Sequence, residues 1–194
     1  MRLEIGEHAR PFSIASGPER FYLEFATRRS ESEFKRAFLA LAPGDRVRIF
    51  GPRGRFFLEE DAPGVLVAGG IGITPMRSML QHAADTRLAT PLTLVYASHD
   101  PTEIAFRADV DDLAQAVPEL RVLYTVSEAT PGWQGLTGRV DADLVAEGAV
   151  ERPGAMYYAA RPPAFVERVR DAVAVLGVPN ERLRLEVFKN YDEP

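Results

Sequence analysis

The chain has 194 residues, 46% of them hydrophobic, and a net charge of −5, so it can form one ordinary domain or two small ones. It has no cysteine, which excludes disulfides, thiolate zinc sites and cysteine-ligated iron–sulfur clusters within the chain. The acidic balance disfavours nucleic-acid binding. No apolar run could span a bilayer and no basic–apolar signal begins the chain, so we expect a cytoplasmic protein that does not bind membranes.

The first sixty residues have the pattern of a small antiparallel sheet or barrel, because short strand-like segments alternate with Gly, Pro and acidic turns. The predicted strands are 2–5, 10–15, 21–27 and 46–50. A helical pattern covers 32–41, and Ser30 or Ser32 can cap it. Positive charges near this helix start could hold a phosphate, and an ordinary capped surface helix is the alternative. We expect this unit to end near residue 60.

The segment VLVAGGIGITP at 65–75 predicts a strand, a turn and a helix in succession. Its first four residues form an apolar run suited to a parallel strand covered on both faces. The glycines let the backbone approach a ligand closely, and Pro75 fits the first turn of a helix. Free N–H groups at such a helix start favour a pyrophosphate. A tight packing turn stays the alternative, because the spacing departs from the usual dinucleotide fingerprint.

From residue 61 onward, strand-like and helical patterns alternate, which predicts a mostly parallel sheet with right-handed crossovers. The predicted strands are 65–68, 92–96, 121–126, 155–159 and 182–188, and the predicted helices between them are 103–117, 141–147 and 163–176. Ligands of such sheets bind beyond the carboxyl ends of the strands. We therefore expect the residues at these ends to converge on one cleft.

Other functional patterns are weak in this sequence. His8, His82 and His99 lack metal-ligand spacing, so we expect surface histidines and no metal site. The chain has no Gly-x-Ser-x-Gly nucleophile elbow and no Walker phosphate loop. A basic tract over 28–55 could face an acidic electron-transfer protein or be an ordinary solvated surface.

Seven segments in order give the chain a resemblance to the ferredoxin–NADP reductase superfamily, and in particular to small oxidoreductases that join a flavin barrel to a nicotinamide-binding domain. The segments are RPFSIAS at 10–16, SEFKRAFLALAPGD at 32–45, GPRGRF at 51–56, GGIGITP at 69–75, WQGLTGRV at 133–140, YYAARPPAFV at 157–166 and EVF at 186–188. The resemblance implies an antiparallel flavin-binding β-barrel over 1–60, incomplete at its N-terminal side, and an α/β NAD(P)-binding domain over 61–194.

The resemblance also implies roles for individual residues. Arg10 would bind the flavin pyrophosphate, and Phe12 would lie against the isoalloxazine ring. Ser13 would hydrogen-bond near the reactive flavin nitrogen, and Glu186 would lie near the site of hydride transfer, so these two are the candidate catalytic residues. The further cofactor-binding positions that it implies are Pro11, Ser32, Gly70, Gly72, Thr74, Pro75, Ala160, Arg161, Pro162 and Phe188.

The sequence departs from the family pattern in three places. Phe12 stands where tyrosine is commoner, and Ala160 and Arg161 stand where many relatives have cysteine and glycine. Family members also place earlier barrel strands and a Pro-Gly-Gln turn before a segment like 2–5. We therefore expect Met1 to be an internal methionine of a longer polypeptide. If the native chain does begin at Met1, the flavin site would be weak or completed by another subunit.

The resemblance implies a flavin-dependent NAD(P)H oxidoreductase that uses FAD, with FMN as the alternative, and passes electrons to a separate acceptor such as an acidic ferredoxin-type iron–sulfur protein. NADH is favoured over NADPH, because Asp100 and Glu103 follow Ser98 and His99 after the second strand of the nucleotide domain. The alternative function is a non-catalytic nucleotide-binding or interaction module derived from the same family. An unrelated α/β fold without flavin is a third alternative, and the oligomeric state stays open.

Overall fold

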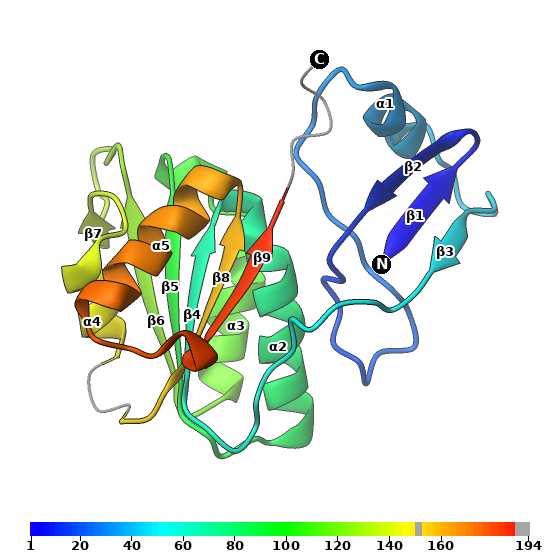
Figure 1. Ribbon diagram of the computed structural model, residues 1–194. Helices are drawn as coiled ribbons and strands as arrows, with labels where there is room; N and C mark the ends of the chain where they lie inside the picture. Colours follow the sequence, from blue (N-terminus) through cyan, green and yellow to red (C-terminus); the bar gives the residue numbers. More distant parts are fainter. Residues whose placement is uncertain (150–152, 189–194) are drawn as a thin grey trace.

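The computed structural model describes residues 1–149 and 153–188 and contains two separate sheets (Figure 1). The smaller sheet is antiparallel, with the strand order β2-β1-β3. Its strands are β1 (Arg2–Ile5), β2 (His8–Pro11) and β3 (Arg48–Phe50). Helix α1 (Glu33–Leu39) packs on this sheet through Phe34, which is buried with Leu3 and Ile5. We call this part of the molecule the N-terminal unit.

The larger sheet has six strands, all parallel to their neighbours, in the order β7-β6-β5-β4-β8-β9. Its strands are β4 (Gly64–Gly69), β5 (Leu92–Ser98), β6 (Leu120–Val126), β7 (Leu136–Thr137), β8 (Met156–Arg161) and β9 (Leu183–Val187). The α-helices are α2 (Ile73–Thr86), α3 (Arg107–Ala116), α4 (Ala142–Gly148) and α5 (Pro163–Val175). Short 3-10 helices are η1 (Gly70–Gly72), η2 (Pro101–Glu103) and η3 (Asn180–Arg182). We call this part the C-terminal unit.

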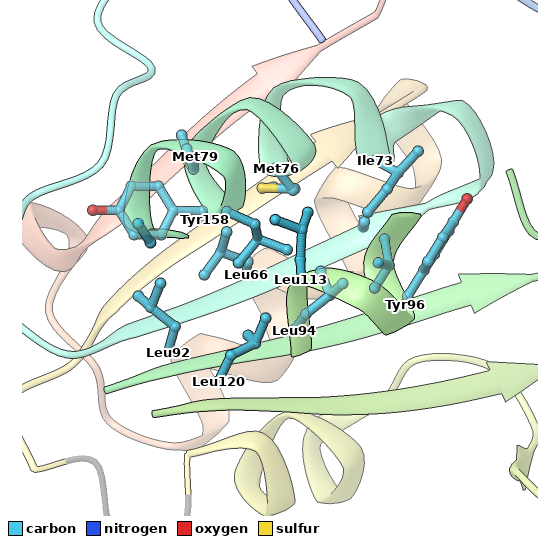
Figure 2. Packing of buried hydrophobic residues seen from close by; sticks show 14 of the residues in the cluster. Leu66, Ile73, Met76, Met79, Leu92, Leu94, Tyr96, Leu113, Leu120 and Tyr158 are labelled. Atoms are coloured by element: carbon cyan, nitrogen blue, oxygen red, sulfur yellow. The ribbon is translucent and has the colours of Figure 1, made fainter. Parts of the chain in front are cut away.

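The central strands of the C-terminal unit are buried on both faces, as their continuous apolar runs predict. Every residue of β4 and β5 is buried. Leu66 and Ala68 pack toward the side of α2 and α3, whereas Val65 and Val67 pack toward α4 and α5. Figure 2 shows the first of these cores, with Leu66 of β4 beneath α2. The strand order reverses between β4 and β8, so ligands are expected at the carboxyl ends of these two strands.

Two strand predictions in the N-terminal unit are wrong. Residues 21–27 form no strand, and the strand predicted over 10–15 ends at Pro11. The reason is that these segments pair through one backbone hydrogen bond, from the Ala15 N–H to the Glu24 carbonyl, and then through a side chain. The Ser16 hydroxyl donates to the Tyr22 carbonyl and accepts from the Glu24 N–H, which replaces a strand ladder.

The predicted fold class is confirmed: a partial antiparallel barrel precedes a parallel-sheet α/β domain. The division at residues 60 and 61 stays a prediction. Within the part of the chain that the structure describes, no helix is both long enough and apolar enough to cross a membrane.

Candidate functional site

A cleft of about 610 Å³ lies where the two units meet, within the range of about 300–1,000 Å³ that is usual for ligand pockets. It receives residues from the segment after β2, from the start of α2 and from β9. The predicted site residues that line it are Arg10, Pro11, Phe12, Ser13, Ser32, Thr74, Pro162, Glu186 and Phe188. Segments far apart in the sequence are thus brought to one place.

A second cleft of the same size adjoins the first. Phe12, Ser13 and Glu186 line both clefts, whereas Pro75 lines only the second. The two clefts therefore meet at the two candidate catalytic residues. Such a junction suits two ligands whose reactive ends must approach each other.

The turn after β4 depends on the backbone conformation of Gly70 and on two side-chain hydrogen bonds to its carbonyl groups. Gly70 has a φ of +49°, a conformation that side chains rarely adopt. The Tyr96 hydroxyl donates to the Gly70 carbonyl at 3.1 Å, and the Thr74 hydroxyl donates to the Ile71 carbonyl at 2.6 Å. Gly72, the other glycine of this turn that was predicted to bind a cofactor, is buried. Hydrogen bonds within the protein therefore fix the shape of the turn.

The predicted site residues on and just after strand β8 are Ala160, Arg161 and Pro162. Ala160 is fully buried in the core of the C-terminal unit and lines neither cleft. Pro162 reaches the cleft. The side chain of Arg161 lies outside the described residues.

Phe12 is held in an aromatic cluster of the N-terminal unit. Its ring centroid lies 5.5 Å from that of Phe34, 5.9 Å from that of Phe38 and 6.0 Å from that of Phe25. The ring is therefore fixed by its neighbours while it lines both clefts. Its role as a flavin contact stays a prediction.

Ser32 caps α1 as predicted, because its side chain accepts a hydrogen bond from the Lys35 backbone N–H at 3.4 Å. Both residues line the cleft. The cap fixes the helix start next to the cleft, and the Lys35 ammonium adds positive charge there.

The charge of the first cleft is strongly positive. Its basic lining residues are Arg2, Arg10, Arg28, Lys35 and Arg53. Among its described lining residues, Glu186 is the one carboxylate. Burial raises the pKa of Glu186 above its usual range. The cleft suits a large anion, with one carboxyl group that takes up a proton more readily than usual.

Several lining residues of the cleft were not predicted as site residues, and Arg53 and Arg28 are two charged examples. Arg53 lines both clefts from the GPRGRF turn, and its place in a glycine- and proline-rich turn was a usable signal. Arg28 crosses between the units and pairs with Glu103 at 3.0 Å, which no local pattern indicates. Within residues 1–149 and 153–188, no group of His, Asp or Glu could hold a metal ion.

Comparisons with known proteins show the family to which the chain belongs. Residues 66–171 match the family of the oxidoreductase NAD-binding domain. The chain is 33% identical over 195 residues to ferredoxin–NADP reductase B of Sorangium cellulosum, covering 94% of this chain and 79% of that protein. It is 30% identical over 187 residues to the flavohemoprotein of Deinococcus radiodurans, covering 92% of this chain and 46% of that protein. The chain thus spans about half the length of the flavohemoproteins that it matches.

Solved structures show the same fold. The cytochrome P450 reductase of Amycolatopsis superposes with a TM-score of 0.83 at 24% identity, covering 97% of this chain and 60% of that one. The FAD/NAD-binding domain of the nitric oxide dioxygenase from Vibrio cholerae superposes with a TM-score of 0.82 at 22% identity, covering 96% and 82%. From the family match and the Sorangium relative, the chain belongs to the ferredoxin–NADP reductase superfamily of FAD- and NAD(P)-binding oxidoreductases.

Proposed function

We propose that this chain takes hydride from a reduced nicotinamide nucleotide onto FAD held in the first cleft and passes the electrons to a separate acceptor. The observation that carries the proposal is the junction of the two clefts at Ser13 and Glu186. FAD supplies the redox chemistry when bound, and the protein supplies alignment and charge.

The residues of the cleft divide this work. Arg10 and Lys35 provide positive charge for the pyrophosphate of the dinucleotide. Ser13 offers a hydroxyl that can donate or accept a hydrogen bond at the junction of the clefts. Glu186, whose pKa is raised by burial, can hold a proton at its carboxyl oxygen near the same point. Phe188 covers the cleft with an apolar side chain and helps to exclude water.

The first test is the visible spectrum of the purified chain with FAD, followed anaerobically after addition of NADH and then NADPH. Retained yellow colour that bleaches on nucleotide addition supports the proposal. If FAD binds and the colour does not bleach, the result supports the non-catalytic module instead. If neither FAD nor FMN binds, the result contradicts the assignment of a flavin cofactor. FMN in a parallel titration tests the alternative flavin.

A matched pair of arginine variants tests the FAD site itself. Arg10→Gln removes a charge that lines the cleft, so we expect FAD to bind about 10–100-fold more weakly, as loss of a charged hydrogen bond predicts. Arg46→Gln removes an exposed charge of the same unit, and FAD affinity should not change. Equal FAD affinities of the two variants would contradict the assignment of Arg10.

We also propose that NADH is the preferred donor. Asp100, Glu103 and Glu128 follow the carboxyl ends of β5 and β6, which lie side by side. The hydrogen bonds from the Thr102 side chain and backbone lower the pKa of Asp100, so its carboxylate stays ionised. The ionised carboxylate of Asp100 repels a 2′-phosphate, whereas that of Glu103 is already paired with Arg28.

The donor preference is tested by the ratio of kcat/KM for NADH to kcat/KM for NADPH. Asp100→Asn keeps an oxygen that can accept from Thr102 and removes the charge. We expect the ratio to exceed one in the wild type and to fall in this variant. Arg121→Gln, which removes a charge far from these strand ends, should leave it unchanged, and a wild type that prefers NADPH would contradict the proposal.

For the acceptor, we propose an acidic ferredoxin-type protein. The Sorangium relative carries ferredoxin in its name, and residues 1–60 hold 11 Lys and Arg against 9 Asp and Glu, a net charge of +2. Arg46 and Arg55 are exposed and lie outside both clefts. The double variant Arg46→Gln/Arg55→Gln should slow reduction of an acidic ferredoxin and leave reduction of ferricyanide unchanged, because long-range attraction speeds protein encounters. Equal loss with both acceptors would contradict this docking surface.

A further inference from the structure

Helix α2 has a polar side that contacts the N-terminal unit. Figure 2 shows the opposite side, where Ile73, Met76 and Met79 point toward the sheet and join its core. Polar residues recur at spacings of three and four on the side away from this core. Those that contact residues 15–20 are Arg77, Ser78, Gln81, His82 and Asp85. We call these five residues the docking face of α2.

The middle of the docking face holds the backbone of the N-terminal unit. The Ser78 hydroxyl donates to the Ser16 carbonyl at 2.7 Å. The Gly17 N–H donates to the Gln81 side-chain oxygen at 2.7 Å in a buried position. Backbone groups held at such distances fix the position of the segment along the helix.

The far end of the docking face is charged. His82 contacts Glu19 at 2.7 Å and Glu60 at 3.0 Å, and Arg20 donates to Asp85 at 2.9 Å. These contacts follow the same direction along the segment as those of Ser78 and Gln81. The segment 15–20 therefore lies in one register against α2, as the trace after β2 beside α2 illustrates (Figure 1).

Arg77 is the most buried charge of this face, with 6% of its surface exposed. Its guanidinium donates to the Ala15 carbonyl at 2.9 Å and to the Glu24 carboxylate at 2.7 Å. On its other side it donates twice to Asp109, at 2.9 and 2.6 Å, and lies 4.6 Å from the ring centroid of Phe106. One planar fork thus joins both units, which a lysine cannot reproduce.

The position of Arg77 links it to the cleft. Ala15 follows Ser13 by two residues, and Arg77 follows Thr74 by three residues on the same helix. Ser13 and Thr74 both line the first cleft. We propose that Arg77 is a positioning residue that sets the distance between the Ser13 segment and the nucleotide turn for hydride transfer, an inference that rests on the proposed reductase function.

The test is anaerobic stopped-flow reduction of the FAD-loaded protein by NADH. Arg77→Met removes the charge and keeps an unbranched side chain. The limiting rate of flavin reduction should fall about 10–100-fold, because a misplacement of about 1 Å can cost that much. The dissociation constants of FAD and NADH should stay close to those of the wild type. Arg77→Lys, which keeps the charge without the fork, should recover part of the rate.

The matched control is Arg121→Met. It removes an arginine that pairs with Glu147 at 3.0 Å within the C-terminal unit, so its limiting rate should equal that of the wild type. Should Arg77→Met fail to fold, Glu24→Gln is the second variant. Its amide oxygen can still accept a hydrogen bond but carries no charge, so the contact with Arg77 becomes weaker while the Asp109 contact stays intact. We expect a several-fold lower limiting rate.

The outcomes separate this inference from the proposed function. A wild type that NADH does not reduce contradicts the reductase function and the inference with it. A wild type that is reduced, with Arg77→Met or Glu24→Gln equally fast, overturns the inference alone. Weaker NADH binding at an unchanged limiting rate also overturns it, because the residue would then act on affinity.

Discussion

The two units of this molecule bury their strands to very different extents. Strands β4 and β5 are buried at every residue, whereas β3 is exposed at every residue. The N-terminal unit has a core of three buried residues, Leu3, Ile5 and Phe34, with a few aromatic and aliphatic neighbours. Since burial of apolar surface is the main source of stability, the core of the C-terminal unit should be enough to keep that unit folded. The N-terminal unit depends more on its contacts with α2.

The largest expected effect tests this difference in packing. Leu66→Ala in β4 removes a fully buried side chain, so the free energy of unfolding should fall by about 2–5 kcal/mol. Ile49→Ala in β3 removes a side chain that is 39% exposed and should cost within about 0.5 kcal/mol. Urea denaturation followed by circular dichroism measures both. Equal losses would show that the two sheets are packed equally well.

The next effect tests the contact between the units. Gln81→Ala leaves the buried Gly17 N–H without its acceptor, which costs about 1–3 kcal/mol. Because the loss is local, hydrogen exchange should become faster at residues 15–20 and stay slow in β4 and β5. Equal acceleration in both regions would mean that the molecule opens as one cooperative unit, and the contrast between the units would then fail.

A pH effect comes third. Burial lowers the pKa of His82, but the hydrogen bonds and charges of Glu60 and Glu19 outweigh it and raise the pKa above its usual value of about 6.5. The stability that His82 contributes is therefore present below about pH 6.5 and is lost as the pH rises through the higher pKa of the folded state. The Tm difference between wild type and His82→Asn should be larger near pH 6 than near pH 9. A difference that does not change with pH would contradict a charged His82.

The smallest effect is expected at a surface pair within the C-terminal unit. Arg121 and Glu147 pair at 3.0 Å, and each side chain is 42% exposed. Exposed pairs contribute about 0–1 kcal/mol, so Arg121→Gln should change Tm little. A loss as large as that of Gln81→Ala would show that exposed charges, and not the docking face, dominate the stability of this protein.

The sequence predicts the C-terminal unit better than the N-terminal one, and the reason is physical. Apolar runs such as 65–68 have one stable environment, a covered parallel strand, and each predicted strand of this unit lies within about one or two residues of the observed one. Residues 21–27 are apolar enough for a strand, but they pair through one backbone hydrogen bond with Ala15 and then through the hydroxyl of Ser16. The two-residue strand β7 gave no detectable pattern.

The site follows the same division. The resemblance to the family assigned Arg10, Ser13 and Glu186 to the flavin site, and in the structure all three line one cleft. The docking face could not be predicted, because Arg77, Ser78 and Gln81 have the spacing of an ordinary solvated helix face. Their role depends on a segment about sixty residues earlier in the chain, and no local pattern carries that information.

Helix α2 is used on both sides, by the sheet core and by the docking face. Adding or removing a single residue within it would turn everything that follows by about 100° around the helix axis. Met79 would then leave the core at the same time as Gln81 and His82 left residues 17–19. A change of length in this stretch should therefore be more damaging than a single substitution, and alignments of its relatives should be free of gaps between residues 73 and 86.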